Sequence, residues 1–211
     1  MNARLKMLPI VALGAAALGL AANAVGQDGR DAKENVVKIG EKAPNFTLTD
    51  SAGQERSLSS YAGRTVVLEW INPECPYVVN CYRSGAMTGA YKKVKALDAT
   101  VVWLAINSTR TTKTEPNQYW IKQHKIEYPI LLDLEGTVGR LYDARRTPHM
   151  FVIDKQGILR YHGAIDDNQF ANKPADEVTN YVVNAVKQVV AGDTVSPDYA
   201  KPYGCTVKYK R

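Results

Sequence analysis

The sequence is poor in the residues that build metal clusters and disulfide-rich folds. It has only three cysteines and three histidines among 211 residues, which excludes a small disulfide-held scaffold and argues against several bound zinc ions. It also lacks a strong excess of one charge, since 27 basic residues are scattered among 21 acidic ones and the net charge is only +6. Nucleic-acid-binding domains usually carry a clustered basic face, so we expect no nucleic-acid partner.

A long hydrophobic run is also missing, but a shorter one lies near the start of the chain. Arg4 and Lys6 precede the apolar or small residues 7–22, and Ala22-Asn23-Ala24 has the small-x-small form of a cleavage site. The run is shorter than the roughly 20 residues that span a bilayer. We therefore predict that residues 1–24 are a signal peptide and that the mature protein is periplasmic or secreted. In the alternative, the signal stays uncleaved, which is the only membrane contact we expect.

The remainder of the chain has room for one domain. Residues 25–36 are mostly polar and are predicted to be a linker, residues 37–192 to be the folded domain, and residues 193–211 to be an irregular, mobile tail that carries Cys205. Hydrophobic residues make up 45% of the sequence and charged residues 23%. This balance is typical of a chain that can bury a core.

Apolar patterning in the domain alternates between strand and helix types. We expect an N-terminal hairpin at 46–53, strands at 65–71, 100–106 and 129–132, helices at 78–97, 115–124 and 136–142, a hairpin at 150–162 and a helix at 176–190. Strands that alternate with helices and then end in a hairpin and a helix indicate an α/β fold. The expected architecture is a mixed central sheet flanked by helices.

One cysteine stands where a buried strand would run into a helix. Cys75 follows the apolar run 65–71, and Pro76 suits the first position of a helix because its missing N–H would have no partner there. The free N–H groups and the dipole at a helix start stabilise a thiolate, which is the nucleophilic form of cysteine. Cys75 is therefore our candidate nucleophile. The alternative is a buried, inert thiol.

A carboxylate interrupts the same apolar strand. Glu69 lies six residues before Cys75, and a carboxylate buried there should have a raised pKa or a partner. It could exchange a proton with a partly buried thiol. In the alternative, Glu69 occupies an edge position and faces solvent.

Three blocks of sequence together resemble the thioredoxin-fold redoxins of the AhpC/TSA type, and most closely an exported peroxiredoxin-like branch. The blocks are Leu68-Glu69-Trp70 with Asn72-Pro73-Glu74-Cys75-Pro76-Tyr77-Val78, then Thr147-Pro148-His149-Met150-Phe151-Val152-Ile153-Asp154, then Tyr203-Gly204-Cys205-Thr206-Val207-Lys208-Tyr209. The resemblance covers about residues 37–209. It implies a thioredoxin-like fold, with Cys75 as the attacking thiol, Glu69 as the buried acid and Pro148 as a cis-proline facing the thiol.

The sequence departs from the best-known members of this group at several positions. Thioredoxins carry Cys-x-x-Cys, but Val78 stands three residues after Cys75. Peroxiredoxins place a threonine three residues before the cysteine, where this chain has Asn72, and an arginine against the thiolate near the position of Thr147-Pro148. These departures favour disulfide exchange over peroxidase activity.

Either of the two other cysteines could pair with Cys75. Cys81 follows it by six residues, which in an intact helix means about 9 Å of rise and about 240° of rotation. A disulfide needs Cα atoms within roughly 7 Å. Cys205 has no such restriction, so we predict Cys75 and Cys205 as the redox pair and Cys81 as a buried spare. In the alternative, a 75–205 disulfide is a static crosslink.

The leading functional hypothesis is an exported thiol–disulfide oxidoreductase that needs no cofactor. Cys75 attacks a disulfide or peroxide substrate, Cys205 resolves the intermediate, and a reducing thiol protein restores both thiols. The first alternative is a peroxiredoxin-type thiol peroxidase. The second is a non-enzymatic copper-binding module like the Sco-type proteins, with Cys75, Cys81 and His149 as soft ligands. The third is a redox-dead binding domain of the same fold.

Overall fold

An eight-stranded mixed sheet forms the centre of the protein. The computed structural model describes residues 36–210. The strand order is β2-β1-β5-β4-β3-β7-β8-β9, and β10 and β6 form a separate two-stranded sheet. The bounds are β1 Thr47–Asp50, β2 Glu55–Ser57, β3 Val66–Trp70, β4 Val102–Asn107, β5 Ile130–Leu132, β6 Arg146–Thr147, β7 His149–Ile153, β8 Leu159–Gly163, β9 Tyr199–Ala200 and β10 Cys205–Thr206.

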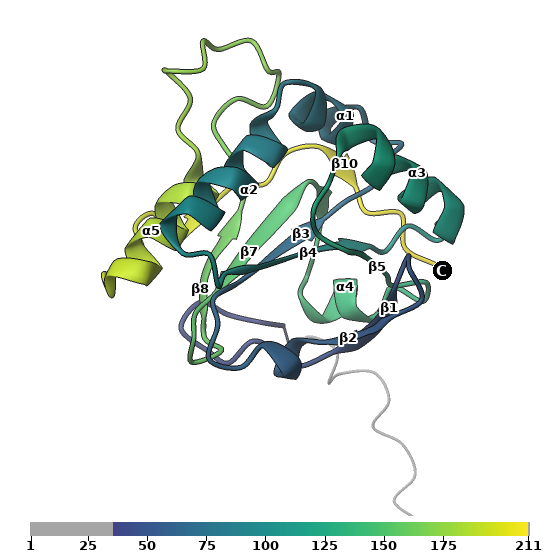
Figure 1. Cartoon of the computed structure of the whole chain (residues 1–211), viewed down its shortest axis with the longest axis horizontal. Coiled ribbons are helices and arrows are strands. Elements are labelled where there is room, and N and C mark those ends of the chain that lie inside the picture. The colour runs from purple at the N-terminus through teal and green to yellow at the C-terminus, as the bar shows by residue number, and fades with distance from the viewer. Residues whose placement is uncertain (1–35, 211) are drawn as a thin grey trace, which may run out of the picture.

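Helices cover both faces of the sheet (Figure 1). One face packs against α1, α2, α3 and α5, and the other against α4 and the segment that precedes β1. The helices are α1 Pro76–Arg83, α2 Ala86–Leu97, α3 Thr114–His124, α4 Thr137–Leu141 and α5 Tyr181–Ala191, and a short 3-10 helix, η2, spans Leu58–Tyr61. The arrangement confirms the predicted α/β fold with a mixed sheet and an N-terminal hairpin.

The central strand β3 divides the core by the alternation of its side chains. It pairs in parallel with β4 and antiparallel with β7, so all five residues are buried. Val67 packs among the residues under α1, α2 and α5, whereas Leu68 and Trp70 pack on the α4 side. Successive residues of a strand point to opposite faces, which puts Glu69 on the same face as α1.

Two predicted helices have different limits in the structure. The segment predicted as one helix over 78–97 is two helices, α1 and α2, because Gly85 takes a left-handed conformation with φ 77°. The helix predicted from residue 176 begins at Tyr181, since the side chain of Asn180 accepts a hydrogen bond from the N–H of Val183. Asn is a preferred N-cap residue, which explains the later start.

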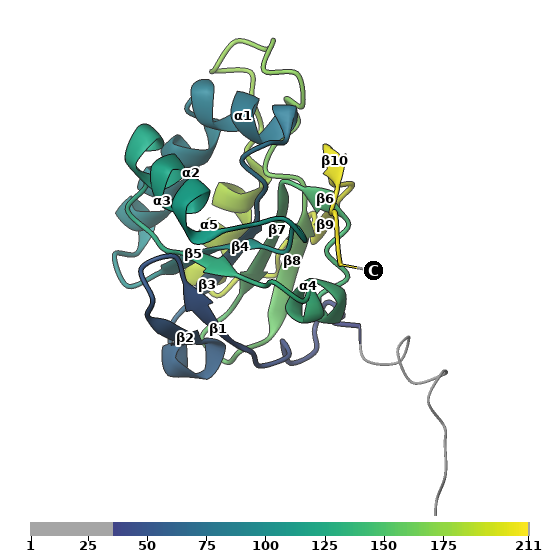
Figure 2. The same ribbon diagram turned by 90° about the vertical axis from the view of Figure 1, so that its right-hand side faces the viewer.

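The C-terminal tail is mostly irregular, as predicted, but two short strands fix it to the domain. β9 adds to the edge of the sheet beside β8, and β10 pairs antiparallel with β6. Beyond β10, the Tyr209 hydroxyl donates to the carbonyl of Ala144 at 2.6 Å, and the Arg140 guanidinium lies 4.8 Å from the centre of the Tyr209 ring. Figure 2 shows the tail, in yellow, passing along β6 and α4. The tail is therefore anchored on both sides of Cys205.

The predicted signal peptide at 1–24 and most of the predicted linker at 25–36 lie outside the described residues. Within residues 36–210, no helix combines the length and the apolar character that a bilayer crossing requires.

We expect the close approach of β8 and β9 to make Gly163 intolerant of substitution. Its φ is +145°, and a Cβ added there would lie 1.9 Å from the carbonyl oxygen of Ala200. Gly163→Ala should lower the free energy of unfolding by about 2 kcal/mol or more, measured by urea denaturation. The matched control is Gly89→Ala inside α2, where an added Cβ meets nothing within 4 Å. Because alanine favours helix, that variant should be about 0.5–1 kcal/mol more stable. Equal effects of both substitutions would contradict this account.

Candidate functional site

The predicted nucleophile caps the first helix. β3 ends at Trp70, a short loop follows, and Cys75 is the N-cap of α1 with Pro76 at the first helical position. The loop is fixed locally, since Asn72 accepts hydrogen bonds from the backbone N–H groups of Glu74 and Cys75, at 2.9 Å each, through its side-chain and backbone oxygens. Cys75 itself is only 1% exposed. Cys75 thus occupies the predicted place at the helix start, under a cover.

The C-terminal tail covers Cys75 where it passes the segment around Pro148. The Thr147–Pro148 bond is cis, and the Cys75 thiol donates to the carbonyl of Thr147 at 3.1 Å. Antiparallel pairing of β10 with β6 sets Cys205 directly opposite Thr147. The approach needs glycine at 204, because a Cβ there would lie 2.1 Å from the Thr147 oxygen. The structure therefore brings Cys75, Pro148 and Cys205 together.

The thiols of Cys75 and Cys205 lie close together, and each shifts the pKa of the other. Burial pushes the pKa of Cys75 upward, but hydrogen bonds from the thiol and backbone of Cys205, the side chain of Thr147 and the backbone of Val78 outweigh it and leave the pKa below its usual value. Burial and the same contact raise the pKa of Cys205 to about 11. Cys75 is therefore the more acidic thiol of the two.

The third cysteine lies away from this pair. Cys81 is buried in α1, 3.6 Å from the hydroxyl of Tyr203, and burial raises its pKa to about 12. All three cysteines are free thiols in the structure. A thiol with such a pKa is a poor nucleophile at neutral pH, which fits the predicted position of Cys81 as a buried spare.

Glu69 is fully buried and fully hydrogen-bonded, so the solvent-facing alternative is excluded. Its carboxylate accepts from the Tyr82 hydroxyl at 2.8 Å, the Trp103 indole at 3.0 Å and the Tyr128 hydroxyl at 3.1 Å. Burial raises the pKa of Glu69 to about 7, and the three hydrogen bonds oppose that rise. None of these bonds goes to Cys75, so any proton exchange between the two must pass through intervening groups or water.

The proposed copper ligands do not converge. His149 lies directly opposite Trp70 in the pairing of β7 with β3, and its ring centre is 4.5 Å from that of Phe151 on the α4 side of the sheet. Cys75 and Cys81 lie on the other side. Among the described residues, no group of three or more His, Cys, Asp or Glu side chains could hold a metal ion. The alternation of side chains along β7 overturns this ligand set, because Pro148 and His149 face opposite sides.

Several residues that shape the site carry no signal in the sequence. Tyr82 and Tyr128 come from α1 and from the residues before β5, and neither stands near Glu69 in sequence. Tyr203 bridges Cys81 to Asp166, to which its hydroxyl donates at 2.7 Å. A buried carboxylate predicts that donors must surround it, but only the folded chain identifies which ones.

A central mixed sheet, a cysteine at the start of the first helix and a cis-proline opposite it define the thioredoxin-like class of redox folds. The model of the AhpC/TSA family matches residues 39–162, and the chain belongs to that family. The thiol-disulfide oxidoreductase ResA of Bacillus thuringiensis subsp. konkukian is 30% identical over 132 residues, which cover 59% of this chain and 69% of the relative.

Solved structures agree on the fold. An uncharacterized conserved protein from Geobacillus kaustophilus superposes with a TM-score of 0.69 at 23% identity, covering 83% of this chain and 94% of the other. A hypothetical protein from Sinorhizobium meliloti superposes with a TM-score of 0.68 at 24% identity, covering 82% and 96%. These structures extend the similarity in fold beyond the segment that the family model matches.

We expect Glu69 to make the protein less stable as the pH rises through neutrality. The folded pKa of about 7 exceeds the ordinary value of 4.5, so the folded protein binds this proton more tightly than the unfolded chain. That contribution is complete below pH 4.5 and is lost as the pH rises through 7. It corresponds to about 3 kcal/mol. The difference in unfolding free energy between wild type and Glu69→Gln, measured by urea denaturation across this range, should show the loss. A difference that does not vary with pH would contradict it.

We also expect Cys205 to control the acidity of Cys75. Cys205→Ala removes the side-chain hydrogen bond that lowers the pKa of Cys75 most, so that pKa should rise. The ultraviolet absorbance of the thiolate, titrated against pH, measures it, with the Cys75 contribution assigned by subtracting a Cys75→Ser titration. Cys81→Ser serves as the control and should leave the titration of Cys75 close to that of the wild type. An unchanged pKa in Cys205→Ala would show that the helix start alone sets it.

Proposed function

We propose that the protein is an exported thiol–disulfide oxidoreductase in which Cys75 attacks and Cys205 resolves. The observation that carries the proposal is the contact between the two thiols at the start of α1, with the pKa of Cys75 lowered and that of Cys205 raised. Membership of the AhpC/TSA family and similarity to a thiol-disulfide oxidoreductase support the same chemistry. The apolar segment near the start of the sequence supports export.

The reaction proceeds by two thiol exchanges. The Cys75 thiolate attacks one sulfur of the substrate disulfide, that bond breaks, and the other substrate sulfur leaves as a thiolate. Cys205 then loses its proton and attacks the sulfur of Cys75, which releases the second substrate thiol and leaves a Cys75–Cys205 disulfide. The substrate has gained two electrons, and a reducing thiol protein returns them to the pair.

Glu69 and Pro148 have supporting roles in this scheme. Glu69 has a pKa of about 7, so it can take or return a proton near neutral pH while Cys205 is deprotonated and reprotonated. The cis bond before Pro148 orients the Thr147 carbonyl toward the Cys75 thiol. For a protein substrate to reach Cys75, β10 must leave β6. That pairing joins only two residues on each strand, so the cost of separation is small compared with the fold.

The cover over Cys75 favours a second candidate, a thiol peroxidase. A sulfur in a residue that is 1% exposed is more accessible to a peroxide than to a protein disulfide. In that reaction Cys75 is oxidised to a sulfenic acid as the peroxide O–O bond breaks, and Cys205 displaces water to form the same disulfide. Against this candidate, the hydrogen bonds that lower the pKa of Cys75 come from Cys205, Thr147 and Val78, without an arginine.

Disulfide mapping and two assays test the function together. After mild oxidation, mass spectrometry should find Cys75 linked to Cys205, and reduction of insulin by the protein should fall at least about 100-fold in Cys75→Ser. Fast, Cys75-dependent peroxide consumption without insulin reduction would favour the peroxidase. A dominant 75–81 linkage, or activity that does not depend on Cys75, would refute both candidates.

Two glycine variants test how much the position of the tail contributes to the rate at which the 75–205 disulfide forms. We expect Gly204→Ala to slow formation of the 75–205 disulfide, because its Cβ would collide with the Thr147 carbonyl and move Cys205 away from Cys75. Gly192→Ala is the matched control, since Gly192 also has a positive φ but an added Cβ meets nothing within 4 Å. The rate of disulfide formation is followed by quenched thiol labelling. Equal rates in the two variants would show that β10 does not position Cys205.

A further inference from the structure

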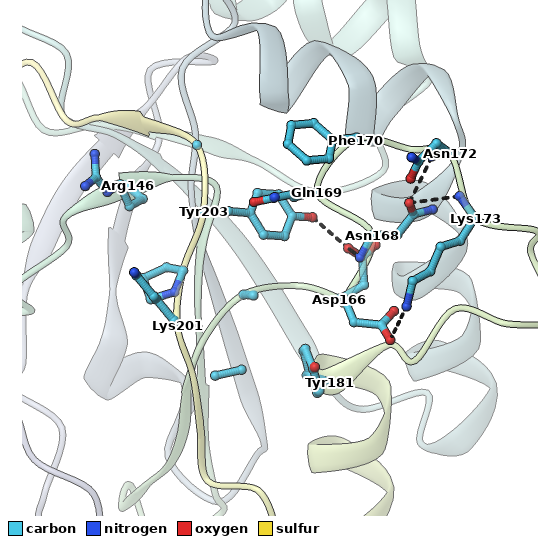
Figure 3. Close-up of a pocket in the computed structure, with 15 residues that line it drawn as sticks. Arg146, Asp166, Asn168, Gln169, Phe170, Asn172, Lys173, Tyr181, Lys201 and Tyr203 are labelled. Atoms are coloured by element: carbon cyan, nitrogen blue, oxygen red, sulfur yellow. Dashed lines mark hydrogen bonds and ion pairs between the residues drawn. The ribbon is translucent and has the colours of Figure 1, made fainter.

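A pocket of about 700 Å³ opens beside Cys205. It lies between the segment after β8 and the tail residues that lead into β10, and its lining includes Asp166, Phe170, Lys201, Tyr203 and Gly204. Figure 3 shows Tyr203 facing Asp166, with Phe170 above them and Arg146 and Lys201 on the opposite side. Gly204 lines the pocket and directly precedes Cys205 in the chain, so the pocket lies next to the residue that carries the proposed resolving thiol. The proposed function assigns it no role.

The two cysteines beside this pocket differ in their exposure. Cys75 is 1% exposed and lies under the tail, whereas Cys205 is partly exposed at the tail itself. When the two are joined in a disulfide, Cys205 is therefore the more exposed of the two residues to an incoming thiolate. A thiolate can approach the sulfur of Cys75 only after the tail has moved away from it.

Leaving-group chemistry favours the same sulfur. Exchange is faster when the departing thiol has the lower pKa. Attack at Cys205 expels Cys75, which keeps the hydrogen bonds from the Thr147 side chain and the Val78 backbone that lower its pKa, whereas attack at Cys75 expels Cys205, whose pKa is raised first of all by burial. Exposure and leaving-group chemistry therefore both favour attack at the sulfur of Cys205.

The surroundings of Cys205 define the chemistry of a partner. Arg146 and Lys201 line one side of the pocket, and neither forms a salt bridge with another described residue. Arg146 and Lys208 are close enough to Cys205 to favour its ionised form. On the far side, Lys173 and Asp167 pair with each other at 2.8 Å. The basic side chains of Arg146, Lys201 and Lys208 lie on the side of the pocket nearest Cys205, whereas Asp166 and the Lys173–Asp167 pair lie across it. Basic groups beside the sulfur attract an anionic thiolate and an acidic chain that carries it.

The pocket also presents an aromatic surface. Phe170 is 60% exposed, and the ring of Tyr77 lies 6.4 Å from that of Phe170 and 6.2 Å from that of Tyr203, measured between centroids. Exposed aromatic rings beside charged groups are typical of protein contact sites.

We infer that this pocket is the docking site of the reducing thiol protein, which binds through an acidic cysteine-bearing segment and attacks the sulfur of Cys205. The inference deepens the proposed function and depends on its Cys75–Cys205 disulfide. The partner thiolate bonds to the sulfur of Cys205, the 75–205 bond breaks, and Cys75 leaves as a thiolate. A second thiol of the partner then attacks the partner's own sulfur in the mixed disulfide. This step releases Cys205, so the partner is oxidised by two electrons.

Two synthetic peptides test the inference on the full-length protein in which mapping has first established the 75–205 disulfide. Each peptide has one cysteine, flanked by aspartates in one peptide and by asparagines in the other. Rates are measured at low and high salt and are corrected for the intrinsic reactivity of each thiol toward a small disulfide. Acid-quenched samples are then mapped to find which cysteine carries the peptide.

We expect the adduct on Cys205 and a rate about 3- to 10-fold higher for the acidic peptide at low salt, with the preference reduced at high salt. Lys201→Glu should abolish or reverse this preference. Lys122→Glu, the same charge change on α3, should preserve it. An adduct mainly on Cys75, or a preference that Lys201→Glu does not alter, would overturn the inference.

A second pair of variants, one with a substitution in the pocket and one control, tests the aromatic surface. Phe170→Ala should slow reduction by a two-cysteine protein probe, reduced thioredoxin, more than reduction by dithiothreitol. Tyr119→Ala removes an aromatic ring from α3 that is 66% exposed, and it should slow neither reaction. Equal effects of these two variants would also contradict the docking site. If oxidation gives no 75–205 disulfide, the proposed function itself fails. If the disulfide forms but the peptide bonds to Cys75, only the docking inference fails.

Discussion

The site depends on the backbone pairing between β10 and β6. This pairing places Cys205 opposite Thr147, and Thr147 in turn accepts the hydrogen bond of Cys75. Neither short strand has enough length to persist alone. Both are fixed by what surrounds them, namely the cis bond at Pro148, the attachment of β9 to the sheet edge and the docking of Tyr209. The proximity of Cys75 and Cys205 is therefore a product of tertiary contacts that span most of the chain.

A second constraint is the cost of placing an acid in the core. The central strand offers Glu69 no water, and three aromatic donors from separate elements compensate by hydrogen bonding. Those donors are themselves part of the packing under α1 and α2, so the electrostatic environment of Glu69 and the integrity of the core cannot be varied independently. Keeping a titratable group there despite its cost is typical of functional positions.

The elements that were predicted correctly are those marked by a long apolar pattern and by residues next to them in the sequence. The apolar run before Cys75 and Pro76 after it were enough to place β3 and the start of α1. The split at Gly85 was not predictable from apolar spacing, because that spacing continues into α2 while the backbone reverses. The short strands of the tail, β9 and β10, were not predicted. A strand of two residues shows no periodic sequence pattern and forms only by pairing with its partner strand. The copper hypothesis failed because adjacency to Pro148 in sequence puts His149 on the opposite face. The donors around Glu69 and the pocket beside Cys205 depend on contacts distant in sequence.

The anchoring of the tail on both sides of Cys205 has a consequence for the kinetics of the pair. A cysteine at the end of a free chain would search a volume set by the length of that chain, and its effective concentration near Cys75 would fall as the chain lengthens. Here β9 and Tyr209 hold the two ends of a short arch, residues 200–209. The arch holds Cys205 opposite Thr147, so in the proposed exchange closure of the 75–205 ring does not depend on diffusion of a free chain end.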